Sequence, residues 1–330
     1  MNRKTEYKKL RIVYMGTPEF AVAPLKRLIG DGCKVLAVVT AADKAAGRGK
    51  RITQSAVKRY ALEKGIPVLQ PTKLKDPDFI RELSGLKADL QVVVAFRMLP
   101  EAVWRLPSLG TFNLHASLLP EYRGAAPIHR ALMNGEKRTG VTTFMIDEKI
   151  DTGHILLQEA LDIGPDEDAG SLHDRLMETG AALVLKTVRQ LATGEIRPIP
   201  QPGSESGRPL QQAPKIHKED CKIDWERPVH ELHNFIRGLA PYPGAYTSLS
   251  LPGSDPVIFK IYQSKAEKAA GRDSERAAPG TIITDGRKQM KVAAGDGCIH
   301  VLALQQQGKR RMNTEAFLNG FKHVDGARFS

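Results

Sequence analysis

The sequence predicts an α/β domain built on a parallel sheet, followed by a smaller β-rich domain. Three features of the 330 residues predict this division. Apolar segments alternate with amphipathic ones up to about residue 195, a stretch rich in Pro, Gly, Ser and Gln follows, and β-like segments then dominate. Alternating strands and helices are typical of a parallel sheet, and several short strands are typical of a small barrel or sandwich. We expect domains at 1–195 and 217–330, joined by a linker at 196–216.

Each strand of the first domain is expected where a short apolar run ends in turn residues. These runs span 10–16, 35–40, 66–71, 89–96, 110–115 and 139–146. Amphipathic helices are expected at 55–64, 76–85, 124–134 and 168–193. After the first strand, Thr17 is expected to cap a helix that has Pro18 at its first position.

The second domain is expected to contain one helix and five strands. The helix covers 230–239, because apolar residues recur there at helical spacing. The strands cover 245–251, 256–263, 280–284, 290–295 and 298–305. Turn residues separate them, which favours a closed or sandwiched antiparallel sheet.

The composition indicates a cytoplasmic protein. No apolar run is long enough to span a bilayer, and the basic N-terminus lacks the apolar core of a signal peptide. The cysteines Cys33, Cys221 and Cys298 are far apart and odd in number, so neither a disulfide framework nor a cysteine zinc site is expected. No other metal-binding spacing occurs, and we expect no metal.

The net charge of +12 is concentrated at the two ends of the chain. Residues 1–60 carry +10, residues 61–216 carry −2, and residues 217–330 carry +4. Basic surfaces on either side of a neutral middle suit a large anion whose reactive end enters the middle. Charge that only maintains solubility is an equally good explanation from these totals.

The glycine after the first strand does not belong to a dinucleotide-binding fingerprint. Gly16 is followed by Thr-Pro-Glu, and Ala21 stands where GxGxxG requires its last glycine. A plain strand-to-helix turn is therefore expected there.

Three polar residues indicate acyl-transfer chemistry. Asn113 and His115 alternate within TFNLHAS, so both side chains lie on one side of a strand near its C-terminal end, where open α/β sheets bind ligands. Asn can hold a developing oxyanion, and His can move a proton near neutral pH. Asp151, in KIDTGHIL, lies on a turn that could bring a carboxylate to them. Because no GxSxG elbow or HExxH is present, the set favours direct transfer to an external nucleophile.

Two long motifs extend this interpretation. NLHASLLPEYRGAAPIHRAL, followed by GVTTFMIDEKIDTGHILLQ, resembles the 10-formyltetrahydrofolate-dependent formyltransferases. YMGTPEFA, AAGRGK and APKI…IDW narrow the resemblance to the branch that formylates methionyl-tRNA, over about residues 10–325. The resemblance implies a monomer with a Rossmann-like formyltransferase domain and an OB-like, tRNA-binding β-barrel. The implied reaction moves a formyl group from 10-formyltetrahydrofolate to the α-amino group of methionine on initiator tRNA, for translation initiation.

The resemblance also assigns residues. It places the catalytic trio at Asn113, His115 and Asp151. It places the folate contacts at Ser117, Leu118, Leu119 and Pro120, with the folate ring near Phe96, Arg97 and Met98. The basic loop that engages the tRNA acceptor end falls on Arg48, Gly49, Lys50 and Arg51. In the implied mechanism Asn113 and protonated His115 stabilise the tetrahedral oxyanion, and Asp151 helps to route a proton to N10.

Two segments depart from this branch. An arginine at position 97 looks more like the corresponding segment of the glycinamide-ribonucleotide formyltransferases. The segment TAADKAAGRGK lacks the prolines that usually precede the basic loop. An amino-sugar-nucleotide N-formyltransferase would share the trio, but it would not require the GRGK loop or the two basic ends. A non-catalytic RNA-binding protein is a further alternative, and the complete trio argues against it.

Overall fold

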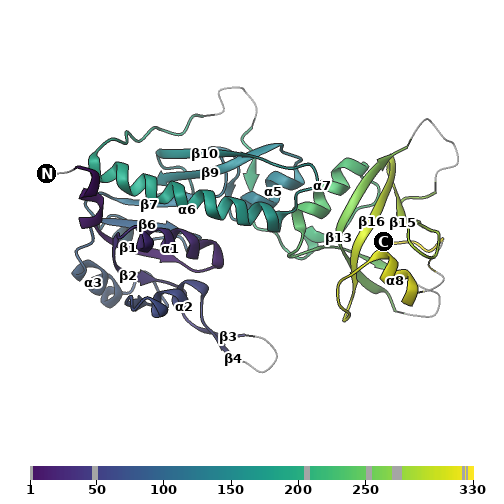
Figure 1. Cartoon of the computed structure of the whole chain (residues 1–330), viewed down its shortest axis with the longest axis horizontal. Coiled ribbons are helices and arrows are strands. Elements are labelled where there is room, and N and C mark those ends of the chain that lie inside the picture. Colours follow the sequence, from purple (N-terminus) through teal and green to yellow (C-terminus); the bar gives the residue numbers. More distant parts are fainter. Residues whose placement is uncertain are drawn as a thin grey trace. The chain divides into compact units, whose positions relative to one another are not determined.

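The computed structural model describes residues 3–46, 51–203, 209–249, 255–269, 277–321, 324 and 326–330 (Figure 1). The chain divides into two compact units. The first unit contains residues 1–124, 138–162 and 173–213, and the second contains 125–137, 163–172 and 214–330. Arg48, Gly49 and Lys50 lie outside the described residues, and Arg51 is described only by its backbone.

A seven-stranded sheet organises the first unit, in the order β10-β9-β7-β6-β1-β2-β5. Its strands are β1 (Arg11–Gly16), β2 (Lys34–Val39), β5 (Val68–Leu69), β6 (Leu90–Val94), β7 (Thr111–His115), β9 (Arg138–Met145) and β10 (Ile155–Asp162). Five neighbouring strands of this sheet run parallel to one another, namely β7, β6, β1, β2 and β5. All five residues of β6 are buried, as expected for a parallel strand covered on both faces.

The helices of the first unit pack their apolar residues against this sheet. They are η1 (Arg3–Lys9), η2 (Glu19–Ala21), α1 (Val22–Gly30), α2 (Ala56–Glu63), α3 (Pro77–Gly85), α4 (Glu101–Trp104) and α6 (Ala169–Thr193), whose first four residues belong to the second unit. On one face, Phe79 and Leu83 of α3 join Val13, Val93 and Val103 in a buried cluster. This packing holds β1 and β6 against the helix, and β7 lies beside β6 in the sheet.

The fold class predicted from the sequence is confirmed, with two corrections in the first unit. The sheet is mixed, because β9 runs antiparallel to β7 and β10 runs antiparallel to β9. The helix expected to begin at Pro18 is also wrong, since the short η2 turn intervenes and Thr17 makes no capping bond. The buried hydroxyl of Tyr14 donates to the carbonyl of Ala21 at 2.6 Å, which fixes this turn, and burial raises the pKa of that hydroxyl.

The second unit is an antiparallel sheet with helices against it. Its main strands are β12 (Ala245–Leu249), β13 (Val257–Lys268), β14 (Ile282–Thr284), β15 (Met290–Ala294), β16 (Gly297–Gln306) and β17 (Met312–Asn313). Its helices are α5 (Pro127–Met133), η3 (Glu219–Cys221), α7 (Val229–Leu239) and α8 (Thr314–Gly320). The sheet closes on itself as a barrel, because the C-terminal residues Arg328 and Phe329 bridge to Thr281 and Leu249.

Aromatic rings fill the centre of this barrel. Phe259 lies edge-on to Phe317 with ring centroids 5.6 Å apart, and Trp225 stacks on Phe329 at 6.0 Å. The indole nitrogen of Trp225 donates to the Thr247 hydroxyl at 3.1 Å, so the large side chain is buried without losing its hydrogen bond.

Two small pairings complete the first unit. A hairpin of β3 (Lys44–Ala46) and β4 (Arg51–Thr53) flanks the basic loop (Figure 1). The strand β8 (Arg123–Gly124) pairs with β11 (Gln212–Ala213), so the end of the stretch expected to be a linker lies beside the loop after β7. Among the described residues, no helix is long and apolar enough to cross a membrane.

Candidate active site

The site is built where β7 ends beside β6 and β9. Asn113 pairs with Val93 of β6 and with Phe144 of β9, and His115 pairs with Thr142. Because side chains alternate along a strand, Asn113 and His115 lie on the same face, as the sequence predicted. The structure thus brings both residues to the edge of the sheet at which β1 and β6 also end.

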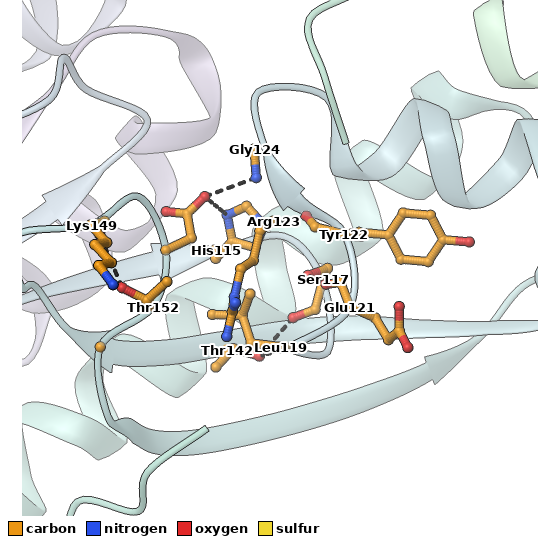
Figure 2. Close-up of polar contacts among 12 residues, drawn as sticks. His115, Ser117, Leu119, Glu121, Tyr122, Arg123, Gly124, Thr142, Lys149 and Thr152 are labelled. Carbon is orange, nitrogen blue, oxygen red and sulfur yellow. Dashed lines mark hydrogen bonds and ion pairs between the residues drawn. The ribbon is translucent and has the colours of Figure 1, made fainter. Parts of the chain in front are cut away.

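His115 is buried, and its two ring nitrogens have different surroundings. Nε2 lies 2.8 Å from the carbonyl oxygen of Tyr122, and since a carbonyl can only accept, Nε2 carries a proton. Nδ1 faces the carboxylate oxygen Oδ2 of Asp151 at 3.8 Å. A dashed line from the labelled His115 ring marks this contact in Figure 2. The ring nitrogen left for a reacting group is therefore Nδ1.

Asp151 comes from the turn before β10, as the sequence suggested. Its Oδ2 accepts a hydrogen bond from the backbone N–H of Gly124 at 2.9 Å (Figure 2). Gly124 has φ +122°, and a Cβ there would lie 2.5 Å from the Ala213 carbonyl, so only glycine can bring its N–H to this place. The turn itself is equally tight, because a Cβ on Gly153 would lie 1.6 Å from the Met145 carbonyl.

Two non-glycine residues of the site have left-handed backbone conformations. Tyr122 has φ +61° and Asp151 has φ +55°. Such a conformation costs about 1–2 kcal/mol per residue and persists only where surrounding contacts impose it. Each residue contributes one contact to the site. The Tyr122 carbonyl contacts Nε2 of His115, and the Asp151 carboxylate accepts from the Gly124 N–H.

Asn113 is half-buried and holds an unsatisfied atom. Its side-chain oxygen Oδ1 is sealed from solvent with no hydrogen-bond partner among the described residues. A buried unpaired acceptor costs about 1–3 kcal/mol, so it is uncommon without a functional reason. With Oδ1 facing inward, the amide nitrogen is the polar atom of Asn113 that can meet a substrate.

The loop after β7 is fixed by hydrogen bonds from inside the protein. Ser117 is fully buried and its hydroxyl donates to the Glu121 carbonyl at 2.6 Å, while Leu119 packs against Phe144 and Ile155. Leu118 and Pro120 are half-buried. The predicted folate loop is thus a rigid turn whose Ser117 hydroxyl is already used (Figure 2).

Sequence reasoning missed the residue that holds this loop. The hydroxyl of Thr142 accepts from the Leu119 N–H at 3.1 Å and donates to the Ser117 carbonyl at 2.6 Å (Figure 2). It also accepts from the side-chain nitrogen of Gln158 at 2.9 Å. These three bonds use its full capacity. A threonine in the middle of the apolar run 139–146 was the available signal, because a buried hydroxyl requires partners.

The segment after β6 places its three predicted residues differently. Met98 is 67 % exposed and Phe96 is half-buried against the cluster behind β6. The guanidinium of Arg97 donates to the carbonyls of Pro71 and Thr72, at 2.7 and 3.0 Å, and lies over the Phe96 ring. Arg97 therefore fastens the segment to the loop after β5.

No group of three or more His, Cys, Asp and Glu side chains within the described ranges is arranged to hold a metal ion. Cys33, Cys221 and Cys298 are free, and burial raises the pKa of the Cys33 thiol to about 11.

Comparison with known proteins identifies the family. Residues 8–188 match the formyl transferase family, and residues 215–322 match the formyl transferase C-terminal domain. The chain belongs to the formyl transferase family. It is 50% identical over 321 residues to a methionyl-tRNA formyltransferase of Bacteroides thetaiotaomicron, covering 97% of this chain and 98% of that protein. It is 52% identical over 323 residues to the methionyl-tRNA formyltransferase of Azobacteroides pseudotrichonymphae, covering 97% and 99%.

Two solved structures share the fold. A sugar 3N-formyl transferase, WlaRD, solved with dTDP and 5-N-formyl-THF, has a TM-score of 0.61 at 19% identity and covers 91% of this chain and 99% of that one. HypX from Aquifex aeolicus in complex with tetrahydrofolic acid also has a TM-score of 0.61, at 17% identity over 97% of this chain and 51% of that one. At such identities the likeness concerns the fold alone.

Proposed function

We propose that this formyl transferase moves a formyl group from 10-formyltetrahydrofolate to the α-amino group of methionine on initiator tRNA, in the cytoplasm. The observation that carries the chemistry is the convergence of His115 Nδ1 and Asp151 Oδ2, 3.8 Å apart, beside the half-buried amide of Asn113. The choice of acceptor is supported by the methionyl-tRNA formyltransferases that are about 50% identical over nearly the whole chain.

The reaction divides between these three side chains. The amine lone pair forms a bond to the formyl carbon, and the electrons of the carbonyl double bond move onto the formyl oxygen. The amide nitrogen of Asn113 donates to that oxygen beside the buried His115, and a donor held in place in this way is worth several kcal/mol. His115 lies two residues further along β7 on the same face as Asn113, so its Nδ1, when it carries a proton, would add a second donor.

The proton that the amine loses must reach N10 as the carbon–N10 bond breaks. His115 Nδ1 and Asp151 Oδ2 offer two proton-carrying atoms 3.8 Å apart. The fixed Nε2 contact with Tyr122 keeps Nδ1 directed at the carboxylate. The electrons on the oxygen re-form the carbonyl double bond as the carbon–N10 bond breaks. The products are the formylated amine and tetrahydrofolate with hydrogen on N10, so atoms and charge balance without a covalent bond to the protein.

The donor and the tRNA are proposed to bind through different residues of the chain. The exposed Met98 and the half-buried Phe96 offer apolar surface for the pterin ring, with the loop 117–120 as a rigid wall. The basic residues Arg48, Lys50 and Arg51, at a chain end that carries +10, would engage the acceptor stem.

The test is formyl transfer from 10-formyltetrahydrofolate to three acceptors offered separately: methionyl initiator tRNA, methionyl elongator tRNA and free methionine. The proposal expects efficient transfer to the initiator, much less to the elongator and none to free methionine. The rate with subsaturating tRNA should fall steeply with added salt, because tRNA binding by basic residues releases counterions. Failure to formylate the initiator tRNA would refute the proposal.

A further inference from the structure

A side chain from the stretch expected to be a linker reaches the turn that carries Asp151. The amide nitrogen of Gln201 donates to the carbonyl oxygen of Asp151 at 2.9 Å and to that of Gly153 at 2.8 Å. Two residues earlier, Ile199 pairs with Ile155 at the start of β10 through two backbone hydrogen bonds of 2.8 and 2.9 Å. Gln201 is thus held beside the turn by the backbone and binds it with both amide hydrogens.

Arg123 fixes the orientation of the Gln201 amide. Its Nε and one terminal nitrogen donate to Gln201 Oε1 at 3.0 and 2.5 Å. The oxygen end of the amide meets only donors, and the nitrogen end meets only acceptors, so the reverse orientation would break all four bonds. The fork of an arginine suits this double contact, which a lysine ammonium cannot reproduce.

Two consecutive residues therefore act on Asp151 from different sides. Gly124 donates its backbone N–H to the carboxylate, and Arg123 acts through Gln201 on the carbonyls around it. The turn needs such support, because Asp151 has φ +55° and Gly153 packs so closely on the Met145 carbonyl that no Cβ would fit.

We propose that Arg123 and Gln201 are positioning residues that hold the Asp151 carboxylate opposite His115. This inference rests on the proposed function of the site, since it assigns Asp151 a part in formyl transfer. Neither side chain touches the reacting atoms in this scheme. Their effect is to keep Oδ2 at its distance from Nδ1 throughout the reaction, when a shift of about 1 Å can cost about 10²-fold in rate.

The experiment compares three variants of the full chain. Gln201→Met keeps the length of the side chain and removes all four hydrogen bonds. Arg123→Lys is the conservative variant, which keeps the charge and can make only one of the two bonds to Oε1. Arg197→Ala, an exposed arginine in the same segment, is the matched control. For each, kcat and both KM values for formyl transfer are measured together with the melting temperature.

Gln201→Met should lower kcat by about 10-fold to 100-fold with both KM values little changed. Arg123→Lys should lower kcat less, and Arg197→Ala should leave it unchanged. In an Asp151→Asn background, Gln201→Met should lower kcat by less than about threefold, because residues that act through one carboxylate are not additive once that carboxylate is gone. An equal loss in both backgrounds, or full activity of Gln201→Met, would overturn the proposal.

Backbone hydrogen exchange separates this inference from the proposed function. If the unmodified protein formylates no acceptor, the proposed function fails, but the positioning of the Asp151 turn by Arg123 and Gln201 can still be tested. Gln201→Met should speed amide exchange across residues 150–154, because two carbonyl contacts of that turn are lost. Unchanged exchange in that segment would refute the positioning role of Arg123 and Gln201, whether or not the protein is active.

Discussion

Replacing Asp151 by Asn removes the negative charge opposite His115 while the shape of the side chain stays the same. An Asn at this position keeps one acceptor oxygen for the Gly124 N–H, so the turn should stay in place. The variant therefore separates the effect of the Asp151 charge from the structural role of its hydrogen bond with Gly124. We expect a large loss of kcat with an almost unchanged KM for the donor.

The size of the loss follows from the distance between the two groups. Unit charges 3.8 Å apart attract each other by about 4 kcal/mol at an effective dielectric constant of about 20. That is the stabilisation available to a proton on Nδ1 of His115 while it moves towards N10. Since the Asp151 side chain is 14% exposed, water screens part of it, and we expect kcat to fall by about 10²–10³.

The assay is single-turnover formyl transfer to methionyl initiator tRNA, with the donor bound beforehand so that chemistry is measured apart from binding. Asp162→Asn, at the exposed far end of β10, is the control for loss of one negative charge. The reasoning would be refuted if Asp151→Asn kept its rate within about threefold of the unmodified protein, or if donor affinity fell as much as the rate.

Three other predictions test different parts of the structure. Asn113→Ala should lower kcat by about 10²–10³ and leave donor affinity nearly intact, and a near-normal rate would remove Asn113 from the mechanism. Thr142→Val should lower the free energy of unfolding by about 2–4 kcal/mol in urea denaturation, because the buried Leu119 N–H and the Ser117 carbonyl both lose their hydrogen bond to the Thr142 hydroxyl. A loss below about 0.5 kcal/mol would contradict this. Asp285 should titrate in NMR with a midpoint of about 2. The backbone N–H groups of Arg287, Lys288 and Gln289 donate to its carboxylate, stabilise the charge and lower the pKa of Asp285 to about 2. These bonds support the fold above about pH 4 and are lost as the pH falls towards 2, so a midpoint near 4 would show that they are absent in solution.

The fold was predictable where apolar runs are long and continuous. The run at 89–96 contains β6, whose residues are all buried, and such a run is typical of a strand in the middle of a parallel sheet. The direction of β9 was not predictable, since nothing in a strand's own sequence distinguishes parallel from antiparallel pairing. β10 was missed because it is an edge strand with exposed residues such as Glu159 and no regular alternation.

The site was predictable as far as residues close in sequence determine it. Alternation along β7 placed Asn113 and His115 together, and the turn of Asp151 was correctly expected to approach them. The partners of these residues come from far along the chain, as with Arg123 and Gln201, which are 78 positions apart. No local pattern marks such a pair, and Gln201 lies in a stretch whose composition suggested only a linker.

The most direct test of the proposed activity is a competition in one tube. Methionyl initiator tRNA and a dTDP-linked amino sugar are mixed at equal concentration with the protein and a limiting amount of 10-formyltetrahydrofolate, and both products are quantified by mass spectrometry. We predict that nearly all of the formyl group is found on the methionine nitrogen. Transfer mainly to the sugar would contradict the proposed acceptor, and transfer to neither would contradict the proposed chemistry.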